Sequence, residues 1–233
     1  MGFQMQKPLN SRLPVYTLFI LATSVLAYTL PGVASLLIFD RLAILNGEAW
    51  RVLSGHTVHF SSTHFVYDLL AFGLAGGVIE YKRYPGCGVL YVVMAFSIGV
   101  SLLVFKPGMD YYGGLSGLAC GAVVYLALFG LHGTPTLRLV SVMVLVLVVS
   151  KVAFELYTGQ SVLLSNRQEP FISMPISHLV GVLSASSVFF YVGYHTRRRM
   201  VNARIGKCFA GVNHQKYVST NFPGSGGCIE EKA

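Results

Sequence analysis

A serine within a glycine-rich run is the first candidate for chemistry in this sequence. Ser116 belongs to the run Gly-Gly-Leu-Ser-Gly at residues 113–117, at the expected start of a helix, where backbone N–H groups are available. A serine there could attack a carbonyl carbon while nearby amides stabilise the oxyanion. Gly113, Gly117 and Gly121 recur every four residues and predict a helix face that a second helix can approach closely. The alternative is a packing motif in which the serine has no chemical role.

A histidine in the last apolar stretch supplies the second reactive group. His178 follows Ser177 and precedes the sequence Leu-Val-Gly, which ends at Gly181. Gly181 shares the face of the histidine by helical spacing, so this helix also has a face of small residues. The two faces could pack together, with His178 as the general base for Ser116. The alternative is a histidine that only hydrogen-bonds a neighbouring helix.

Three histidines and an aspartate precede and enter another apolar stretch. His64 and Asp68 are four residues apart and therefore share a helix face. The sequence has no His-Glu-x-x-His motif, and no carboxylate has metal-ligand spacing with His56, His59 and His64. A zinc metalloprotease is therefore disfavoured, and chelator sensitivity would reveal one. We expect no metal and no cofactor.

The elements that must position these residues are membrane helices. The chain has 233 residues, of which 54% are hydrophobic and 11% charged, whereas soluble domains carry roughly 25% charged residues. Several apolar stretches approach the roughly 20 residues that cross a bilayer. We therefore predict an all-α polytopic bundle in contact with the lipid bilayer. The six expected transmembrane helices cover residues 14–31, 62–81, 87–105, 113–131, 137–156 and 172–194.

The charge pattern predicts topology. The net charge of +8 does not indicate nucleic-acid binding, because lysines and arginines lie in short stretches between or after apolar runs. With six helices, the richer stretches fall on one side, which the positive-inside rule places in the cytoplasm together with both termini. The charges assigned to the opposite side are Arg41, Arg51, Lys106, Lys151 and Arg167 with Asp40, Glu48, Asp110, Glu155 and Glu169.

We divide the chain into three parts on this basis. Residues 1–13 form a cytoplasmic N-terminal segment, residues 14–195 the six-helix domain, and residues 196–233 a basic, polar cytoplasmic tail. We expect residues 200–233 to be loosely ordered. No internal repeat is evident, which disfavours a transporter. The spacing of the four cysteines does not predict a disulfide framework.

Taken in order along the chain, these motifs resemble the rhomboid family of intramembrane serine proteases. Gly114-Leu115-Ser116-Gly117 is similar to the family's Gly-x-Ser-Gly nucleophile motif, and the sequence around His178 is similar to its Ala-His-x-x-Gly motif. The other matching positions are Trp50-Arg51 in the first loop, His59 and His64 entering the second helix, and Glu80 at its end. The resemblance covers about residues 14–195.

The resemblance implies a six-helix rhomboid-like bundle with a Ser116–His178 dyad and no third acidic member. It implies hydrolysis of a peptide bond in or near the transmembrane segment of another, membrane-anchored protein. The Ser116 amide and the His64 side chain would hold the oxyanion, and the loop before the sixth helix would gate substrate entry. The supporting positions are His64, Asp68, Gly114 and Leu115. Together with the topology, the resemblance implies a bacterial inner membrane and an extracytoplasmic active site.

Two positions depart from the family pattern. Asp68 replaces an asparagine, so burial could keep it protonated as a donor, or it could accept from His64 and orient that ring, which the i,i+4 spacing favours. Cys120 stands where bacterial members often have an aromatic residue. The Gly-Leu-Ser-Gly core and residues 63–70 are similar to the rhombosortase branch, which implies substrates with a Gly-Gly-containing C-terminal sorting signal.

Two further interpretations stay open at this point. A catalytically inactive rhomboid-like protein would bind transmembrane helices without cutting them, although retention of Ser116 and His178 argues against it. A small transporter would use the same polar groups along a pathway. Nothing in the sequence specifies an oligomeric state.

Overall fold

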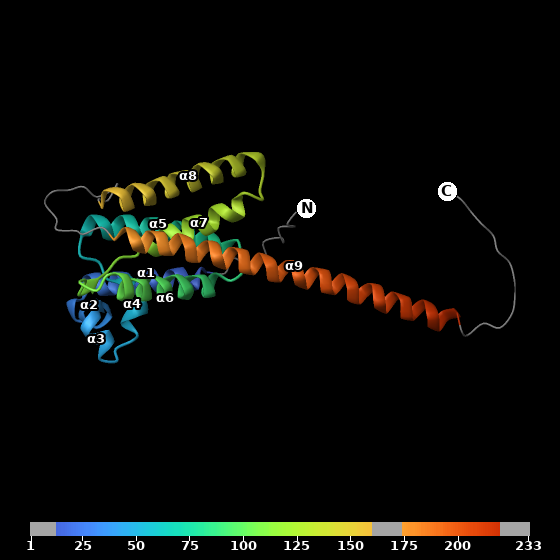
Figure 1. Ribbon diagram of the computed structural model, residues 1–233, viewed down its shortest axis with the longest axis horizontal. Coiled ribbons are helices and arrows are strands. Elements are labelled where there is room, and N and C mark those ends of the chain that lie inside the picture. The colour runs from blue at the N-terminus through green and yellow to red at the C-terminus, as the bar shows by residue number, and fades with distance from the viewer. Residues whose placement is uncertain (1–12, 160–173, 220–233) are drawn as a thin grey trace. The chain divides into compact units, whose positions relative to one another are not determined.

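The structure, a computed structural model, describes residues 13–159 and 174–219 (Figure 1). The chain divides into two units, Met1–Phe190 and Tyr191–Ala233. Most of the expected N-terminal segment, most of the loop before the last apolar helix and the end of the tail lie outside the described residues.

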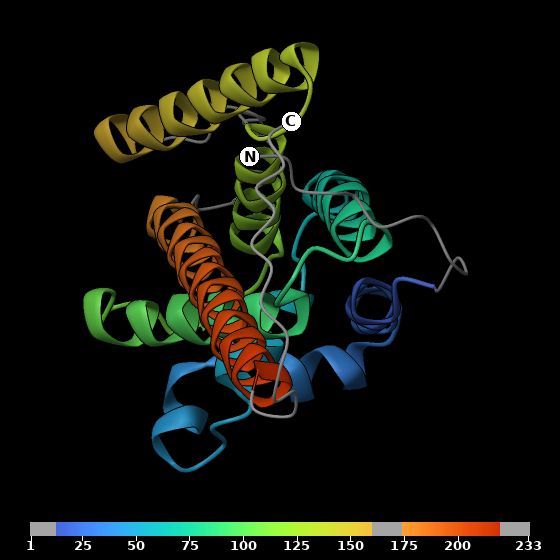
Figure 2. The same cartoon turned by 90° about the vertical axis from the view of Figure 1, so that its right-hand side faces the viewer.

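The described part of the chain is almost entirely helical, which confirms the predicted all-α polytopic fold. The helices are α1 (Val15–Thr29), α2 (Pro31–Leu37), α3 (Arg41–Leu45), α4 (Arg51–Ser54), the 3-10 turn η1 (Gly55–Thr57), α5 (Ser62–Tyr81), α6 (Cys87–Phe105), α7 (Ser116–Gly130), α8 (Pro135–Thr158) and α9 (Pro175–Ser219). Two short strands, β1 (Phe39–Asp40) and β2 (Tyr111–Tyr112), pair antiparallel. In the first unit α7 contacts α5, α6 and α8, and Figure 2 shows it among them.

Four described helices are long and apolar enough to cross a membrane. They are α5, α6, α8 and the segment Pro175–Thr196 of α9. A fifth span results if α1 and α2, which meet at a 120° bend, count as one. The proline at the start of α2 cannot continue the hydrogen bonding of α1. Since α7 has only 15 residues, the expected count of six spans stays a prediction.

The start of α7 differs from the predicted helix over 113–131. Gly113 and Gly114 precede the helix, and Gly114 has a φ of +140°, which L side chains rarely adopt. A Cβ on Gly113 would lie 2.5 Å from the carbonyl oxygen of Val58. The two glycines therefore form a tight passage from β2 into α7, and the helix begins at Ser116.

A carboxylate fixes the beginning of α1. Glu80, near the end of α5, accepts hydrogen bonds from the backbone N–H of Tyr16 at 3.0 Å and of Thr17 at 2.6 Å. It also accepts from the Thr17 hydroxyl at 2.6 Å. First-turn amides lack partners within their own helix, and a negative charge is favourable there. Glu80 therefore joins the start of α1 to the end of α5.

The loop between α1 and α5 is a packed element. Arg51 is buried and donates to the carbonyl oxygens of Ser35 at 2.8 Å and Ile38 at 2.9 Å. His56 donates through Nε2 to the Ala95 carbonyl oxygen of α6 at 2.9 Å. Burial lowers the pKa of His56 to about 4, so the ring is neutral near neutral pH. Pairing of β1 with β2 then ties this loop to the segment that enters α7.

Helix α9 extends further than the sequence predicted. We expected a loosely ordered tail from residue 200, but the helix runs to Ser219. Residues 196–219 contain no proline, and their four arginines, two lysines and two alanines are strong helix formers. Polarity alone therefore gave the wrong expectation for this segment.

Candidate functional site

Ser116 is the first residue of α7 and is partly exposed. The first internal hydrogen bond of this helix runs from the N–H of Ala119 to the carbonyl oxygen of Leu115, at 2.8 Å. The N–H groups of Ser116 and Gly117 thus precede the helical ladder and point out of its N-terminal end. A carbonyl group that reacts with this serine would meet backbone donors there.

Glycine backbones bring α7 and α9 into direct contact. A Cβ on Gly117 would lie 2.9 Å from the carbonyl oxygen of Ser177, and one on Gly121 would lie 2.7 Å from that of Gly181. A Cβ on Gly181 would in turn meet the carbonyl oxygen of Gly117. Ser116 and His178 each adjoin a residue of this contact in sequence.

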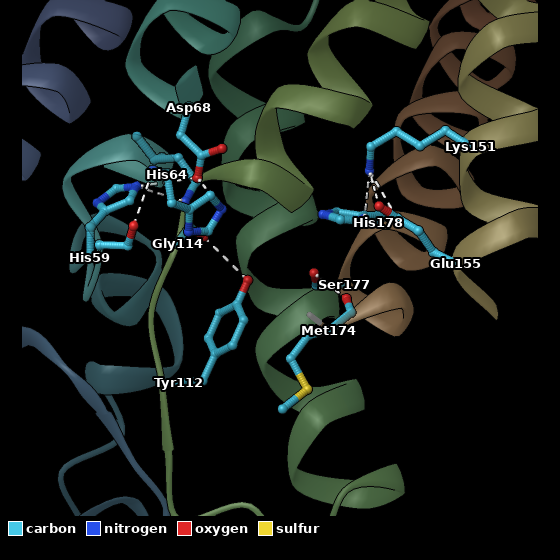
Figure 3. Close-up of polar contacts among 12 residues, drawn as sticks. His59, His64, Asp68, Tyr112, Gly114, Lys151, Glu155, Met174, Ser177 and His178 are labelled. Atoms are coloured by element: carbon cyan, nitrogen blue, oxygen red, sulfur yellow. Dashed lines mark hydrogen bonds and ion pairs between the residues drawn. The ribbon is translucent and has the colours of Figure 1, made fainter. Parts of the chain in front are cut away.

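Two charged residues of α8 lie beside His178. The Nδ1 atom of His178 is 2.6 Å from Oε2 of Glu155 and 3.1 Å from Nζ of Lys151. The lysine and the glutamate are themselves paired, at 2.9 Å to Oε2 and 2.8 Å to Oε1. Figure 3 shows this pair at one end of the imidazole, while its other end points toward the side where His64 and Asp68 lie.

A second carboxylate–histidine group lies across α7. Oδ2 of Asp68 is 3.2 Å from Nε2 of His59 and 3.1 Å from Nε2 of His64 (Figure 3). The N–H of Leu115 donates to Nε2 of His59 at 3.3 Å. One carboxylate oxygen therefore lies between the two rings, and His59, which accepts from Leu115, connects them to the residue before Ser116.

Gly114 lies between this group and Tyr112. A Cβ at Gly114 would lie 2.9 Å from Cε1 of His64 and 3.7 Å from Oδ2 of Asp68, so only glycine allows this approach. The Tyr112 hydroxyl donates to the Gly114 carbonyl oxygen at 3.2 Å (Figure 3). Burial raises the pKa of Tyr112, which keeps the hydroxyl protonated and able to donate.

The predicted site residues fall into two groups that meet at the start of α7. One consists of Ser116, Gly117, Gly121, His178 and Gly181, on α7 and α9. The other consists of His64, Asp68, Gly113, Gly114 and Leu115, on α5 and the segment before α7. In the described residues, no group of three or more histidines, cysteines or acidic residues is arranged to hold a metal ion.

The sequence interpretation missed the roles of Lys151 and Glu155. We counted both as charges on the extracytoplasmic side, but they lie within α8 and contact His178. Their i,i+4 spacing was the available signal, because it predicts an ion pair within a helix. Their contact with a residue of another helix has no sequence signal.

A family model and individual known proteins both match this chain, and both are rhomboids. A model of the Rhomboid domain matches residues 46–195, more than half of the chain. Rhomboid protease GlpG of Klebsiella pneumoniae is 37% identical over 87 residues, which cover 37% of this chain and 31% of that protein. Rhomboid protease GlpG of Salmonella newport is 33% identical over 88 residues, again 37% of this chain and 31% of that protein. The matches thus span about a third of the length of these curated relatives.

Proposed function

Since this multi-pass membrane protein belongs to the rhomboid family, we propose that it is an intramembrane serine protease with Ser116 as nucleophile and His178 as general base. The observation that carries the proposal is the backbone contact of α7 with α9 at Gly117 and Gly181. This contact places the helix of the serine directly against the helix of the histidine. The protease relatives support the same activity.

The proposed reaction begins with attack of the Ser116 hydroxyl oxygen on the carbonyl carbon of a peptide bond. Nε2 of His178 accepts the serine proton and then delivers it to the leaving amine. A water molecule, activated by the same nitrogen, then hydrolyses the acyl-enzyme and regenerates the serine. Each step uses the imidazole atom opposite the one that contacts Glu155.

The oxyanion lies, in this proposal, at the N-terminal end of α7. The backbone N–H of Ser116 supplies one donor and the His64 side chain a second. Oδ2 of Asp68 lies 3.1 Å from Nε2 of His64. We therefore prefer an Asp68 that orients His64 to a protonated Asp68 that donates to the oxyanion. Gly114 leaves room for His64 at this point, and Leu115 fixes His59 beside it.

The proposed substrate is a membrane-anchored protein that is cut in or near its transmembrane segment. The site lies among helices that are suited to the bilayer, so the chemistry favours a substrate segment that reaches it from the lipid. More specifically, we propose substrates with a Gly-Gly-containing C-terminal sorting signal, because the sequence is similar to that of rhombosortases. The bacterial inner membrane, with the site open to the extracytoplasmic side, is its proposed location.

The test uses the full-length protein purified in detergent and a panel of transmembrane substrates, one with a Gly-Gly C-terminal signal. We expect wild type to cleave at least one substrate and Ser116→Ala and His178→Ala to cleave none. Wild type should also react with a fluorophosphonate probe, and Ser116→Ala should not. Cleavage that persists in Ser116→Ala would exclude the serine mechanism. A folded wild type that neither cleaves nor reacts with the probe would favour a binding-only protein.

A further inference from the structure

The acidic residue on α8 gives the proposed site a third member. We propose that Glu155 is a positioning residue that orients His178 and stabilises its protonated form, so that Glu155, His178 and Ser116 act as a triad. This inference rests on the proposed protease function. It departs from the family resemblance, which implies a dyad without an acidic partner.

The short contact between Glu155 and His178 fixes the position of a proton. The two atoms are 2.6 Å apart, and an imidazole lone pair facing a carboxylate at this distance would be repulsive. The contact is also shorter than the 3.1 Å between Nδ1 and the Lys151 ammonium, whose hydrogens are directed to the two carboxylate oxygens. Nδ1 therefore carries hydrogen and donates it to Oε2. A neutral imidazole then has its lone pair on Nε2, the nitrogen that must accept the serine proton.

The burial of Glu155 indicates that this residue has a functional role. Its side chain is fully buried, although α8 is the least buried of the four long apolar helices. A carboxylate away from water is costly unless it is paired, so a fully buried ionisable residue on an apolar helix indicates a functional site. Glu155 places that carboxylate on Nδ1 of the histidine that the mechanism uses.

Lys151 is what keeps Glu155 charged. Its ammonium contacts both carboxylate oxygens, at 2.8 and 2.9 Å, from one helical turn earlier on α8. An ionised Glu155 stabilises the imidazolium that forms when His178 takes the serine proton. Among the described residues, Glu155 and Lys151 of α8 contact His178, and His64 of α5 is a more distant contributor.

A purely structural ion pair between α8 and α9 is the competing explanation. The two differ in kinetics, because a structural pair affects the amount of folded protein while a positioning residue affects the turnover of each molecule. The variants are Glu155→Gln, Glu155→Asp and the double variant Glu155→Gln/Lys151→Met. Glu48→Gln, a carboxylate in the first loop that pairs with Arg51 at 2.7 Å, is the matched control.

We expect Glu155→Gln to lower kcat about 10²- to 10⁴-fold with KM changed less than about threefold, as for loss of the acidic residue of a triad. Glu155→Asp should recover about tenfold or more of that loss. The acidic limb of the kcat/KM profile should move to lower pH by about one unit in Glu155→Gln, because the imidazolium loses its counter-charge. Glu48→Gln should match wild type.

The double variant separates folding from catalysis. It removes both charges, so it should fold even if Glu155→Gln alone does not, and it should still be slow. A double variant with wild-type kcat, or Asp and Gln variants that slow equally with an unmoved pH profile, would overturn the inference.

A measurement that does not depend on cleavage keeps this inference distinct from the proposed function. Nitrogen NMR of ¹⁵N-histidine protein, with the His178 signals assigned by the His178→Gln variant, should show a protonated Nδ1 and an unprotonated Nε2 at neutral pH. The reverse tautomer would overturn the role of Glu155 even if Ser116 is the nucleophile. Cleavage that does not depend on Ser116 would instead overturn the proposed function.

Discussion

Two carboxylate–histidine groups flank the start of α7, and they are built differently. Glu155 contacts one histidine and a lysine of its own helix. Asp68 contacts two histidines, His59 and His64. Both carboxylates are buried, so in each case the partner decides what the carboxylate can do.

Because their partners differ, we expect the two carboxylates to have different roles. A carboxylate paired with a lysine keeps its negative charge and can stabilise a cation that forms beside it, which is what a general base requires. A carboxylate that lies between two imidazoles mainly holds rings in place, which suits donors aimed at an oxyanion. The comparison predicts that changes on the Glu155 side will act on proton transfer, and changes on the Asp68 side on oxyanion stabilisation.

The largest effect should come from separating α9 from α7. In Gly181→Ala the new methyl group would overlap the Gly117 carbonyl oxygen, so the helices must move apart and His178 with them. We expect loss of activity of more than about 100-fold, with a stability loss of about 3 kcal/mol. Cleavage assays and thermal denaturation in detergent measure both.

Gly77→Ala is the matched control, because a Cβ there meets nothing within 4 Å. It should leave activity unchanged and raise stability slightly, since alanine favours a helix over glycine. Equal behaviour of Gly77→Ala and Gly181→Ala would contradict the close helix contact on which the Glu155 side of the comparison depends.

A smaller effect should follow removal of the lysine alone. Lys151→Met takes the ammonium away from the buried Glu155, and breaking such a pair is destabilising. Since the Lys151 side chain is 20% exposed, we expect a stability loss of about 2 kcal/mol, below the 3–5 kcal/mol of fully buried pairs. Thermal denaturation checks this, and a stability equal to that of wild type would mean that Glu155 does not need its lysine.

Asp68→Asn tests the other side of the comparison. An amide can still accept one hydrogen bond but cannot hold two rings as an anion, so we expect about a tenfold fall in kcat, close to the effect of one hydrogen bond. The fall should be smaller than that of Glu155→Gln. Unchanged kcat together with an unchanged pH profile would remove both the orienting and the donating role of Asp68.

The smallest effect concerns His56, a histidine whose ring bonds a backbone carbonyl rather than a carboxylate. Because its pKa is lowered to about 4 from the usual 6.5, the unfolded chain binds a proton at higher pH than the folded one. Its contribution to stability is complete above about pH 6.5 and is lost as pH falls toward 4. We expect a loss of about 1 kcal/mol between pH 7 and 5.5.

His56→Gln removes this titration while it keeps a side-chain donor for the Ala95 carbonyl oxygen. The fall in melting temperature over the same pH range should therefore be smaller in the variant than in wild type. Parallel curves for the two proteins would show that His56 binds its proton equally well in the folded and in the unfolded chain.

Sequence periodicity and turn residues were enough to place most helices. The predicted ranges 62–81 and 87–105 match α5 and α6, because serine before the first and proline and glycine before the second mark clear starts. The start of α7 was placed three residues too early, since a Gly-Gly pair inside an apolar stretch does not reveal its backbone conformation. That conformation depends on Val58 and His64, which approach from elsewhere in the chain.

Only some residues of the candidate site could be predicted from the sequence. Ser116, His178, His64 and Asp68 could be named from motifs and spacing, because each motif lies within a few residues. Glu155 could not, since it is 23 residues from His178 on a different helix. The i,i+4 spacing of Lys151 and Glu155 predicts their pairing within α8, but which helix that face of α8 turns toward depends on helix packing.

The pairing of Lys151 with Glu155 within one helix also bears on biogenesis. Helix α8 is synthesised before α9, so it enters the bilayer while His178 is still to come. A lone carboxylate would resist insertion, but a carboxylate with a lysine one turn away forms a compact neutral pair. The helix thus brings its own counterion to the membrane, and the proposed catalytic groups come together only when α9 docks.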